Sequence, residues 1–244
     1  MKSVGIIPSR YASTRFPGKP LADINGKTMI RRVYEQAKLS HSLSAIFVAT
    51  DDQRIMNEVE SFGGNVIMTS PNHPSGTDRC FEALEKIGKE KYDVVVNIQG
   101  DEPFIHAEQI NKVVKSFDNK EVQISTLAHK ISDRRDLVNP SLVKIARKTN
   151  GEALYFSRSP IPFIREARTE DWTTYFSFLK HIGIYAYRSR VLEEIVKLPP
   201  SSLEKAESLE QLRWLENGYN IMVEITHHES FPIDTPEDLR KITS

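Results

Sequence analysis

The sequence predicts an α/β protein with a mostly parallel, doubly wound sheet and a smaller antiparallel subdomain. The first observation is the alternation of short β-branched runs with amphipathic helical patterns from residue 4 to residue 118, which is typical of a parallel sheet covered by helices. The second is a change near residue 122, after which strand-like runs follow one another without a long helix, as antiparallel strands do. The third is the length of 244 residues, enough for one large domain or for one domain with an insertion.

The first part of the chain alternates between strand and helix patterns. Val4–Ile7 is a short β-branched run, and we expect Pro8 to end that strand because proline has no N–H to donate. The helices show apolar residues three and four positions apart, which is the spacing of a buried helical face. Strands are expected at 4–7, 45–50, 66–68 and 93–98, and helices at 28–39, 55–62, 80–87 and 107–117.

The second part of the chain has a different rhythm. Short apolar runs predict strands at 122–128, 142–146, 153–156, 181–187 and 221–226, and residues 157–165 form a proline-stiffened loop. Helical spacing returns at 189–197 and 203–217. Thr235 is a natural N-cap with Pro236 in the first turn, so we expect a final helix over 237–242.

The charge balance argues against a protein that coats a polyanion. Lys plus Arg number 33 and so do Asp plus Glu, which gives a formal net charge of zero, so we expect no binding to nucleic acid. Cys80 is the only cysteine, which rules out a disulfide within the chain and favours a reducing compartment. Neither a secretory signal pattern nor an apolar run of ~20 residues occurs. We therefore expect a cytoplasmic protein without membrane insertion.

The loop after the first strand, residues 8–20, gathers cations and hydroxyl groups. It contains Arg10, Arg15 and Lys19, with Ser13 among the hydroxyls between them. A cation-bearing loop that leaves a buried strand is how α/β proteins hold polyphosphates, although a solvated basic loop is the alternative. The loop matches neither G-x-x-x-x-G-K-[ST] nor G-x-G-x-x-G, so a plain dinucleotide-dependent dehydrogenase is a poor interpretation.

Loops 69–79 and 99–103 also leave the carboxyl ends of expected strands, where ligands bind in open α/β sheets. The first carries Arg79 and the second carries Asp101. An acid in that position can be a Mg²⁺ ligand, although a helix N-cap or a turn residue is the alternative. If Asp101 and Asp234 face the same crevice, two carboxylates and a triphosphate complete a Mg²⁺ site. That arrangement predicts phosphoryl or nucleotidyl transfer.

Hydrogen-bonding side chains in the second part suit a hydroxylated, carboxylate-bearing ligand. His181 and Tyr185 lie four apart on an expected strand and so share a face, for which core packing is the commoner explanation. The remaining candidates of this kind are Arg158, Arg165, Glu210 and Gln211. No set of side chains has zinc-ligand spacing, and no Ser-His-Asp arrangement stands out.

Seven segments together resemble the 3-deoxy-manno-octulosonate (KDO) cytidylyltransferase family, also called CMP-KDO synthetases. They are I-I-P-S-R-Y-A-S-T-R-F-P-G-K-P-L, H-P-S-G-T-D-R, V-V-N-I-Q-G-D-E-P, A-L-Y-F-S-R-S-P-I-P, H-I-G-I-Y-A-Y-R, L-E-Q-L-R and I-D-T-P-E-D-L. They follow the family order from residue 6 to residue 239, which is nearly the whole chain. Two departures stand out: Pro232 and Ile233 occupy positions where the family commonly has glycine and valine, and residues 166–178 follow no family pattern.

The resemblance implies a nucleotide-diphospho-sugar transferase fold and the reaction of CTP with KDO to give CMP-KDO and pyrophosphate, for lipopolysaccharide biosynthesis. It also implies Mg²⁺ as the cofactor and a homodimer joined through the smaller subdomain. On this interpretation residues 1–121 and 189–244 form the nucleotide-binding domain. Residues 122–188 then form the smaller sugar-binding and dimerisation subdomain.

Two sets of site residues are expected from the loops and the resemblance together. Arg10, Lys19, Asp101 and Asp234 are the expected catalytic residues, and the two acids among them are the expected magnesium ligands. Substrate binding is expected of Ser13, Arg15, Arg79, Gln99, Arg165, His181, Tyr185, Glu210 and Gln211.

Besides the dinucleotide-dependent dehydrogenase, two other functions remain as alternatives to KDO cytidylyl transfer. Another sugar-activating transferase, acting on 8-amino-KDO, sialic acid or another 2-keto sugar acid, would share most of these motifs. A catalytically silent nucleotide-binding regulator need not keep both acids, so the presence of Asp101 and Asp234 together with Arg10 and Lys19 counts against it.

Overall fold

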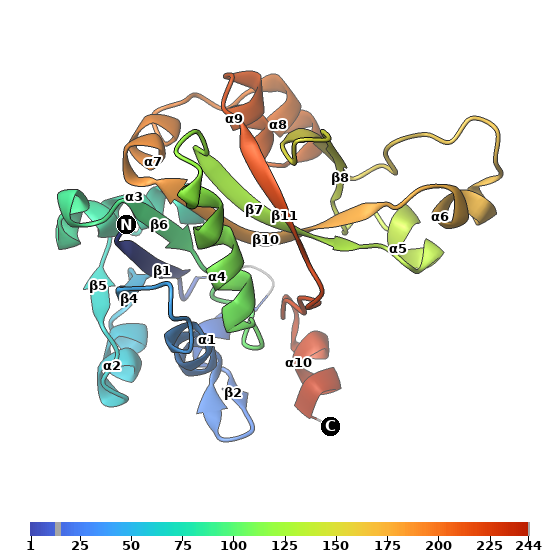
Figure 1. The fold of residues 1–244 in the computed structure, drawn as a ribbon. Helices are drawn as coiled ribbons and strands as arrows, with labels where there is room; N and C mark the ends of the chain where they lie inside the picture. The colour runs from blue at the N-terminus through green and yellow to red at the C-terminus, as the bar shows by residue number, and fades with distance from the viewer. Residues whose placement is uncertain (13–15, 244) are drawn as a thin grey trace. The chain divides into compact units, whose positions relative to one another are not determined.

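The computed structural model describes residues 1–12 and 16–243 of the chain, shown as a ribbon in Figure 1. The chain divides into two units. Unit 1 comprises Met1–Lys115, Ile184–Val196 and Ser230–Ser244, and unit 2 comprises Ser116–Gly183 and Lys197–Glu229. Among the described residues, no helix has both the length and the apolar run that crossing a bilayer requires.

Unit 1 is built on a mostly parallel sheet, as the alternation of strand and helix patterns predicts. The strands β1 (Ser3–Ser9), β4 (Ala45–Thr50), β5 (Val66–Met68) and β6 (Val94–Asn97) are parallel in the order β6-β1-β4-β5, and the last residues of β10 (Leu179–Arg188) pair antiparallel with β6. The helices are α1 (Met29–Lys38), α2 (Gln53–Ser61), α3 (Gly76–Ile87), α4 (Ala107–Lys115), α7 (Ser189–Ile195) and α10 (Pro236–Thr243), with 3-10 turns η1 (Lys19–Leu21) and η2 (Lys89–Lys91). All four residues of β6 are buried, as expected of a central strand.

Pro8 does not end the first strand, contrary to the expectation from the sequence. β1 continues through Ser9, with Pro8 in register with Ala49 of β4. The carbonyl of Ile6 accepts a hydrogen bond from the amide of Ile98 on the β6 side. Because alternate residues of a strand present their backbone to the same side, the nitrogen of Pro8 faces a position beyond the end of β6. No donor is needed there, so the proline is tolerated.

Three helices of unit 1 begin at side chains that cap them. Thr28 accepts a hydrogen bond from the third residue of α1, Asp52 accepts one from the second residue of α2, and Ser75 accepts one from the third residue of α3. Such caps satisfy amides that have no partner inside the helix. The three caps fix the points at which the chain turns back from the sheet.

A short hairpin that the sequence analysis does not predict, β2 (Asp23–Ile24) with β3 (Lys27–Thr28), precedes α1. It carries Ile24 into a buried cluster with Met29 and Ile233, against which Phe16 and Leu239 pack. Residues from both ends of the sequence therefore share one small core. This core anchors the segment that leads into α10.

Unit 2 contains parallel and antiparallel strand pairs. β7 (Ile124–Lys130) pairs parallel with β11 (Ile221–Thr226), whereas β8 (Lys144–Arg147) pairs antiparallel with β9 (Ala153–Ser157) and, at Lys180, with the start of β10. The other elements are η3 (Ser116–Asp118), α5 (Arg134–Val138), η4 (Thr169–Asp171), α6 (Trp172–Tyr175), α8 (Ser202–Glu207) and α9 (Gln211–Glu216). The antiparallel pairs lie in the middle of the chain, as predicted.

The helix predicted over 203–217 is two helices. α8 ends at Glu207, and Ser208 adopts a left-handed conformation with a φ of 51°. The amide of Leu209 then donates to the carbonyl of Glu204 at 3.2 Å, which closes the helix end. Glycine is the usual residue at such a turn. Because serine stands in its place, the sequence does not indicate that the helix ends here.

The segment 166–178 contributes to the core of unit 2. The rings of Trp172 and Phe178 stack with centroids 6.2 Å apart, and both are buried in a cluster with Ile131 and Leu137. The indole N–H of Trp172 donates to a backbone carbonyl at 3.1 Å. A stretch without a family pattern is thus held by apolar packing.

The two units divide the chain at points other than the predicted domain boundaries. Residues 197–229, expected in the nucleotide-binding domain, belong to unit 2 because β11 pairs along its whole length with β7. Residues 184–188, expected in the smaller subdomain, belong to unit 1, where residues 185–188 pair with β6.

Candidate functional site

A cavity of about 250 Å³ lies in unit 1 among the loops that follow β1, β5 and β6. The segment before α10 also lines the cavity, through Asp234. The three loops that are expected to converge at the carboxyl ends of the strands therefore do lie around one cavity. The lining residues are Pro8, Ser9, Arg10, Lys19, Pro20, His73, Pro74, Ser75, Gly76, Arg79, Gln99, Gly100, Asp101 and Asp234. Arg10 and Lys19, two of the cations expected to hold phosphate, therefore share one cavity with both expected metal ligands.

Lys19 joins the two acids of this cavity. Its Nζ atom lies 2.7 Å from Oδ2 of Asp101 and 3.4 Å from Oδ1 of Asp234. The exposed fractions of the three side chains are 14%, 26% and 39% in that order. Water screens such partly buried charges less than it screens charges on an open surface. The cavity thus contains a compact group of one cation and two anions.

A tight turn fixes the backbone from which Lys19 extends. Gly18 has a φ of 72°, which favours glycine, and its amide donates to the carbonyl of Tyr11 at 3.0 Å. A Cβ atom on Gly18 would also lie 3.1 Å from the Tyr11 ring. Lys19 then opens η1, in which Pro20 is buried. The turn sets the direction in which the lysine leaves the loop.

Backbone contacts bring Asp234 to the same place as Asp101. The amide of Ile233 donates to the carbonyl of Asp101 at 2.9 Å, and the Ile233 side chain is buried in the core that precedes α10. On the other side, the amide of Thr235 donates to Oδ2 of Asp238 at 3.1 Å at the start of α10. The isoleucine that departs from the family pattern thus anchors the segment that carries the second acid.

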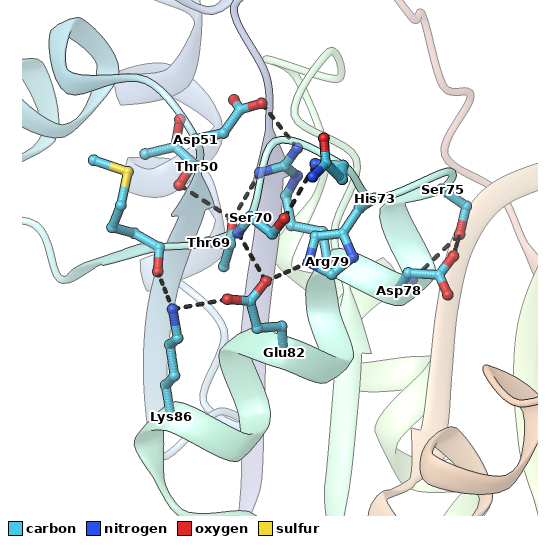
Figure 2. A network of polar contacts seen from close by, with 12 residues as sticks. Thr50, Asp51, Thr69, Ser70, His73, Ser75, Asp78, Arg79, Glu82 and Lys86 are labelled. Carbon is cyan, nitrogen blue, oxygen red and sulfur yellow. Dashed lines mark hydrogen bonds and ion pairs between the residues drawn. The ribbon is translucent and has the colours of Figure 1, made fainter.

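Arg79 is held inside unit 1 by partners from two strand ends, as Figure 2 shows. The residue is 4% exposed, its Nη1 donates to Oγ1 of Thr69 at 2.6 Å, and its Nη2 lies 3.2 Å from Oδ2 of Asp51. The hydroxyl of Thr69 donates in turn to the carbonyl of Thr50 at 3.1 Å. This network fixes the guanidinium against the wall of the cavity.

A second part of the network centres on Glu82 (Figure 2). Its carboxylate contacts His73, accepts the amide of Ser70 at 2.8 Å and pairs with Lys86 at 2.7 Å. Burial alone would raise the pKa of Glu82, but the bonds from Lys86, Ser70 and His73 outweigh it and lower the pKa to about 2. His73, which lines the cavity, is therefore held next to a permanent negative charge.

Glu102, the neighbour of Asp101 in the chain, is a buried acid with a raised pKa. It is 5% exposed, and its Oε2 atom has no hydrogen-bond partner among the described residues. Burial raises the pKa of Glu102 to about 7, against a smaller lowering by the Ser230 side chain, and the neighbouring charge of Asp101 adds to the rise. A proton on Glu102 spares unit 1 a buried negative charge next to Asp101.

The donor set in the cavity suits a hard divalent cation. Two carboxylates already converge on one cationic centre, the ammonium of Lys19. Mg²⁺ typically takes one or two carboxylates together with phosphate oxygens and water. In the part of the chain that the structure describes, no group of three or more His, Cys, Asp or Glu side chains could hold a metal ion. The protein would accordingly supply two ligands and leave the others to substrate and solvent.

Four of the expected sugar-binding residues belong to unit 2. Nε2 of His181 lies 3.0 Å from Oγ1 of Thr126. The ring of Phe156 contacts the imidazole edge-on, with the two ring centroids 5.4 Å apart. Burial lowers the pKa of His181 to about 3, so the ring is neutral at physiological pH. The other three are Arg165, exposed in the loop after β9, Glu210 at the N-cap of α9, and Gln211, buried at the start of α9.

Tyr185 lies in unit 1 and is not among the residues that line the cavity. It is 7% exposed, and its ring stacks on Tyr187 with centroids 6.1 Å apart. Ser13 and Arg15 lie outside the described residues. Their expected roles stay predictions.

Three polar side chains that line the cavity are missing from the expected set, those of Ser9, His73 and Ser75. Ser9 is 4% exposed and follows Pro8, and because a proline favours the end of a strand, the sequence places Ser9 in the loop and not in β1. His73 stands three residues before the start of α3, within H-P-S-G-T-D-R. Its position in the loop after β5 is the signal that could have identified it.

Comparisons with known proteins relate the chain to enzymes that transfer cytidylyl groups. The cytidylyltransferase family model matches residues 4–225. The 3-deoxy-manno-octulosonate cytidylyltransferase of Parabacteroides distasonis is 59% identical over 245 residues, which cover 99% of this chain and 96% of that protein. The 8-amino-3,8-dideoxy-manno-octulosonate cytidylyltransferase of Shewanella frigidimarina is 49% identical over 243 residues, with 99% and 97% covered.

A solved structure gives the same relationship at the level of the fold. CMP:2-keto-3-deoxy-manno-octonic acid synthetase complexed with CTP matches with a TM-score of 0.92 and 43% identity, covering 100% of this chain and 97% of that chain. The agreement over the full length confirms the predicted fold class.

Proposed function

The chain belongs to the family of 3-deoxy-manno-octulosonate cytidylyltransferases, and on that premise we propose that it transfers the cytidylyl group of CTP to KDO. The products are CMP-KDO, the activated sugar for lipopolysaccharide biosynthesis, and pyrophosphate. The observation that carries the proposal is the meeting of Lys19, Asp101 and Asp234 in one cavity with Arg10 and Arg79. Three cations and two acids in one crevice suit a triphosphate and its metal ion.

The reaction is an in-line displacement at the α-phosphorus of CTP. The hydroxyl on the anomeric C2 of KDO forms the new P–O bond, the bond to pyrophosphate breaks, and the hydroxyl proton passes to solvent. Arg10 and Lys19 neutralise the charge that develops on the departing pyrophosphate. Asp101 and Asp234 would hold Mg²⁺, which when bound would supply Lewis-acid polarisation of the phosphate oxygens. Positioning and neutralisation of charge account for most of the catalysis in such a site.

The sugar is assigned to the hydrogen-bonding residues of the second set. His181 is assigned to the sugar as a neutral imidazole, which can donate from one nitrogen and accept at the other, and its Nε2 contacts Oγ1 of Thr126 in this structure. The exposed Arg165 is suited to the carboxylate, because its guanidinium can bind a carboxylate through two hydrogen bonds. Gln99 lines the cavity and is assigned to both cytidine and sugar. Tyr185, Glu210 and Gln211 complete the proposed sugar contacts.

The second candidate is the same transfer to 8-amino-KDO. The observation that favours it is the 49% identity to the Shewanella frigidimarina protein, which carries that substrate in its name. The two sugars differ at one substituent, so the two reactions need the same treatment of the triphosphate. Only the residues that face position 8 of the sugar would distinguish them.

We further propose a homodimer that works in the cytoplasm. Support for a dimer comes from unit 2, where the side chains of Phe163 and Tyr175 are 73% and 70% exposed. Large apolar side chains that form an interface are exposed in this way when one subunit is considered by itself. Support for the compartment comes from the lone, buried Cys80 and from the proposed use of CTP. Sedimentation at several concentrations, with Tyr175→Ser for comparison, tests the dimer.

A substrate panel tests the proposed function. Purified protein with CTP and Mg²⁺ is given KDO, 8-amino-KDO or sialic acid, and pyrophosphate release is followed together with formation of the CMP-sugar. We expect rapid release with KDO and slower or no release with the others. Preference for 8-amino-KDO would replace the first candidate by the second, and release with none of the three sugars would refute both.

A further inference from the structure

We infer that the ammonium of Lys19 occupies the place of the divalent cation between Asp101 and Asp234, and that the phosphates of the nucleotide draw it away. This inference rests on the proposed function for the identity of the nucleotide. It rests on the contacts alone for the competition between lysine and metal. The contacts are the distances of 2.7 Å and 3.4 Å from Nζ to one oxygen of each acid.

The two acids need a cation between them. The hydrogen bond from the amide of Ile233 to the carbonyl of Asp101 holds the segments that carry Asp101 and Asp234 next to each other. Two carboxylates that share a site repel each other. A lysine ammonium is a compact charge on a flexible stem, so it can neutralise the pair without a change of backbone. In this structure Lys19 does so with its side chain 14% exposed.

The ammonium and a metal ion exclude each other at this position. Mg²⁺ binds its oxygen ligands at ~2.0–2.1 Å, which would place it within a few ångströms of the present position of Nζ if it used the same two oxygens. Like charges at that separation repel strongly in a partly buried site. Metal binding through both acids therefore requires the lysine side chain to leave.

The same cavity provides the place to which the ammonium moves. Arg10 and Arg79 line it together with Lys19, so phosphate groups bound there offer a new anionic partner for the lysine. Nucleotide binding then frees the two carboxylates for the metal, and the two ligands favour each other's binding. By thermodynamic linkage, metal must raise the affinity for nucleotide by the same factor.

Binding of Mn²⁺ without any nucleotide tests the competition directly. Mn²⁺ affinity is measured by electron paramagnetic resonance for the wild type, Lys19→Met, Lys19→Arg and the control Lys89→Met, which removes a lysine paired with Glu193 at 2.7 Å elsewhere in unit 1. We expect Lys19→Met to bind Mn²⁺ about tenfold tighter than the wild type or better, because a competing charge is gone. Lys19→Arg and Lys89→Met should match the wild type.

Each other outcome overturns the inference. Unchanged or weaker Mn²⁺ binding by Lys19→Met would show that the ammonium does not compete with the metal. Equal tightening by Lys19→Arg would show that charge is not the cause. Because no nucleotide or sugar is present, these results do not depend on the substrate panel, and failure of that panel would leave them standing.

A second measurement tests the movement toward phosphate. CTP affinity is measured in the presence of EDTA for the same four proteins. We expect Lys19→Met to bind CTP about tenfold more weakly than the wild type, with Lys19→Arg and Lys89→Met close to it. Equal CTP affinity in Lys19→Met and the wild type would refute the transfer of the ammonium to the nucleotide.

Discussion

Gly100 packs against the carbonyl oxygen of Pro8 so closely that a Cβ atom on Gly100 would lie 2.9 Å from it. The contact joins the loop after β6 to the last residues of β1, and both line the cavity. The neighbour is a backbone atom of a buried strand, which cannot move as the end of a flexible side chain can. The absence of a side chain at residue 100 is therefore a condition for the two loops to meet.

Substitution of this glycine tests the close approach. We expect Gly100→Ala to lower the free energy of unfolding by about 1–3 kcal/mol, because the added methyl group forces the two loops apart. Urea denaturation of the purified variants measures the change. The matched control is Gly76→Ala, whose Cβ would meet the Pro8 side chain at 3.3 Å and should cost less. Equal losses in the two variants would contradict the explanation.

Removal of one expected metal ligand tests the role of the acids. Asp101→Asn keeps the size of the side chain but loses its charge, and we expect turnover of CTP and KDO at saturating Mg²⁺ to fall ~10³-fold or more. Pyrophosphate release gives the rate. Asp118→Asn, at an exposed acid that does not line the cavity, should leave the rate unchanged. Near-normal turnover of Asp101→Asn would exclude Asp101 from catalysis.

The ion pair of Arg79 with Asp51 is expected to stabilise the fold mainly by giving each of the two mostly buried charges a partner. Arg79→Met should lower the free energy of unfolding by about 3 kcal/mol, since the carboxylate of Asp51 then stays in a poorly hydrated place without its partner. The double variant Asp51→Asn/Arg79→Met should recover part of that loss. Urea denaturation of the two single variants and the double variant measures the coupling, and strictly additive losses would argue against it.

The raised pKa of Glu102 predicts a stability that falls as the pH rises. A carboxyl group whose pKa is about 7 in the folded protein and 4.5 otherwise stabilises the fold fully below pH 4.5. That contribution is lost as the pH rises from 4.5 through about 7, because between these two values only the folded protein holds the proton. The difference between the two values amounts to about 3 kcal/mol.

Glu102→Gln isolates this contribution, because the amide keeps a neutral, hydrogen-bonding group at every pH. We expect the unfolding free energy of the variant, relative to the wild type, to increase between pH 5 and pH 8. Parallel urea titrations at each pH give the difference. A constant offset across the range would mean that Glu102 does not change its protonation there.

Much of the fold follows from local signals that act over a few residues. The bounds of β4, β5 and β11 agree with the predicted runs, because each run is apolar and ends at polar or glycine-containing stretches. The features that differ from prediction depend on contacts that are distant in sequence. Pro8 continues β1 because β6 ends beside it, and Ser208 breaks a helix without the glycine that usually marks such a turn.

For the candidate site, the sequence predicts which residues take part but not the contacts between them. Strand ends and loop chemistry identify Lys19, Asp101 and Asp234, and these residues lie together in the structure. That one lysine contacts both acids was not predictable, because Asp234 is brought to Asp101 by a hydrogen bond from the amide of Ile233 to the carbonyl of Asp101. The catalytic and binding roles of all the expected residues stay predictions until the variants are measured.

The ion pair of Lys19 with Asp234 joins residues 215 positions apart in the sequence. During synthesis the basic loop leaves the ribosome early, whereas the second carboxylate emerges only after residue 234 has been added. A nascent chain therefore lacks half of the acid pair for almost the whole of its translation. Fragments that stop short of that residue are expected to be inert, however well their first strands have folded.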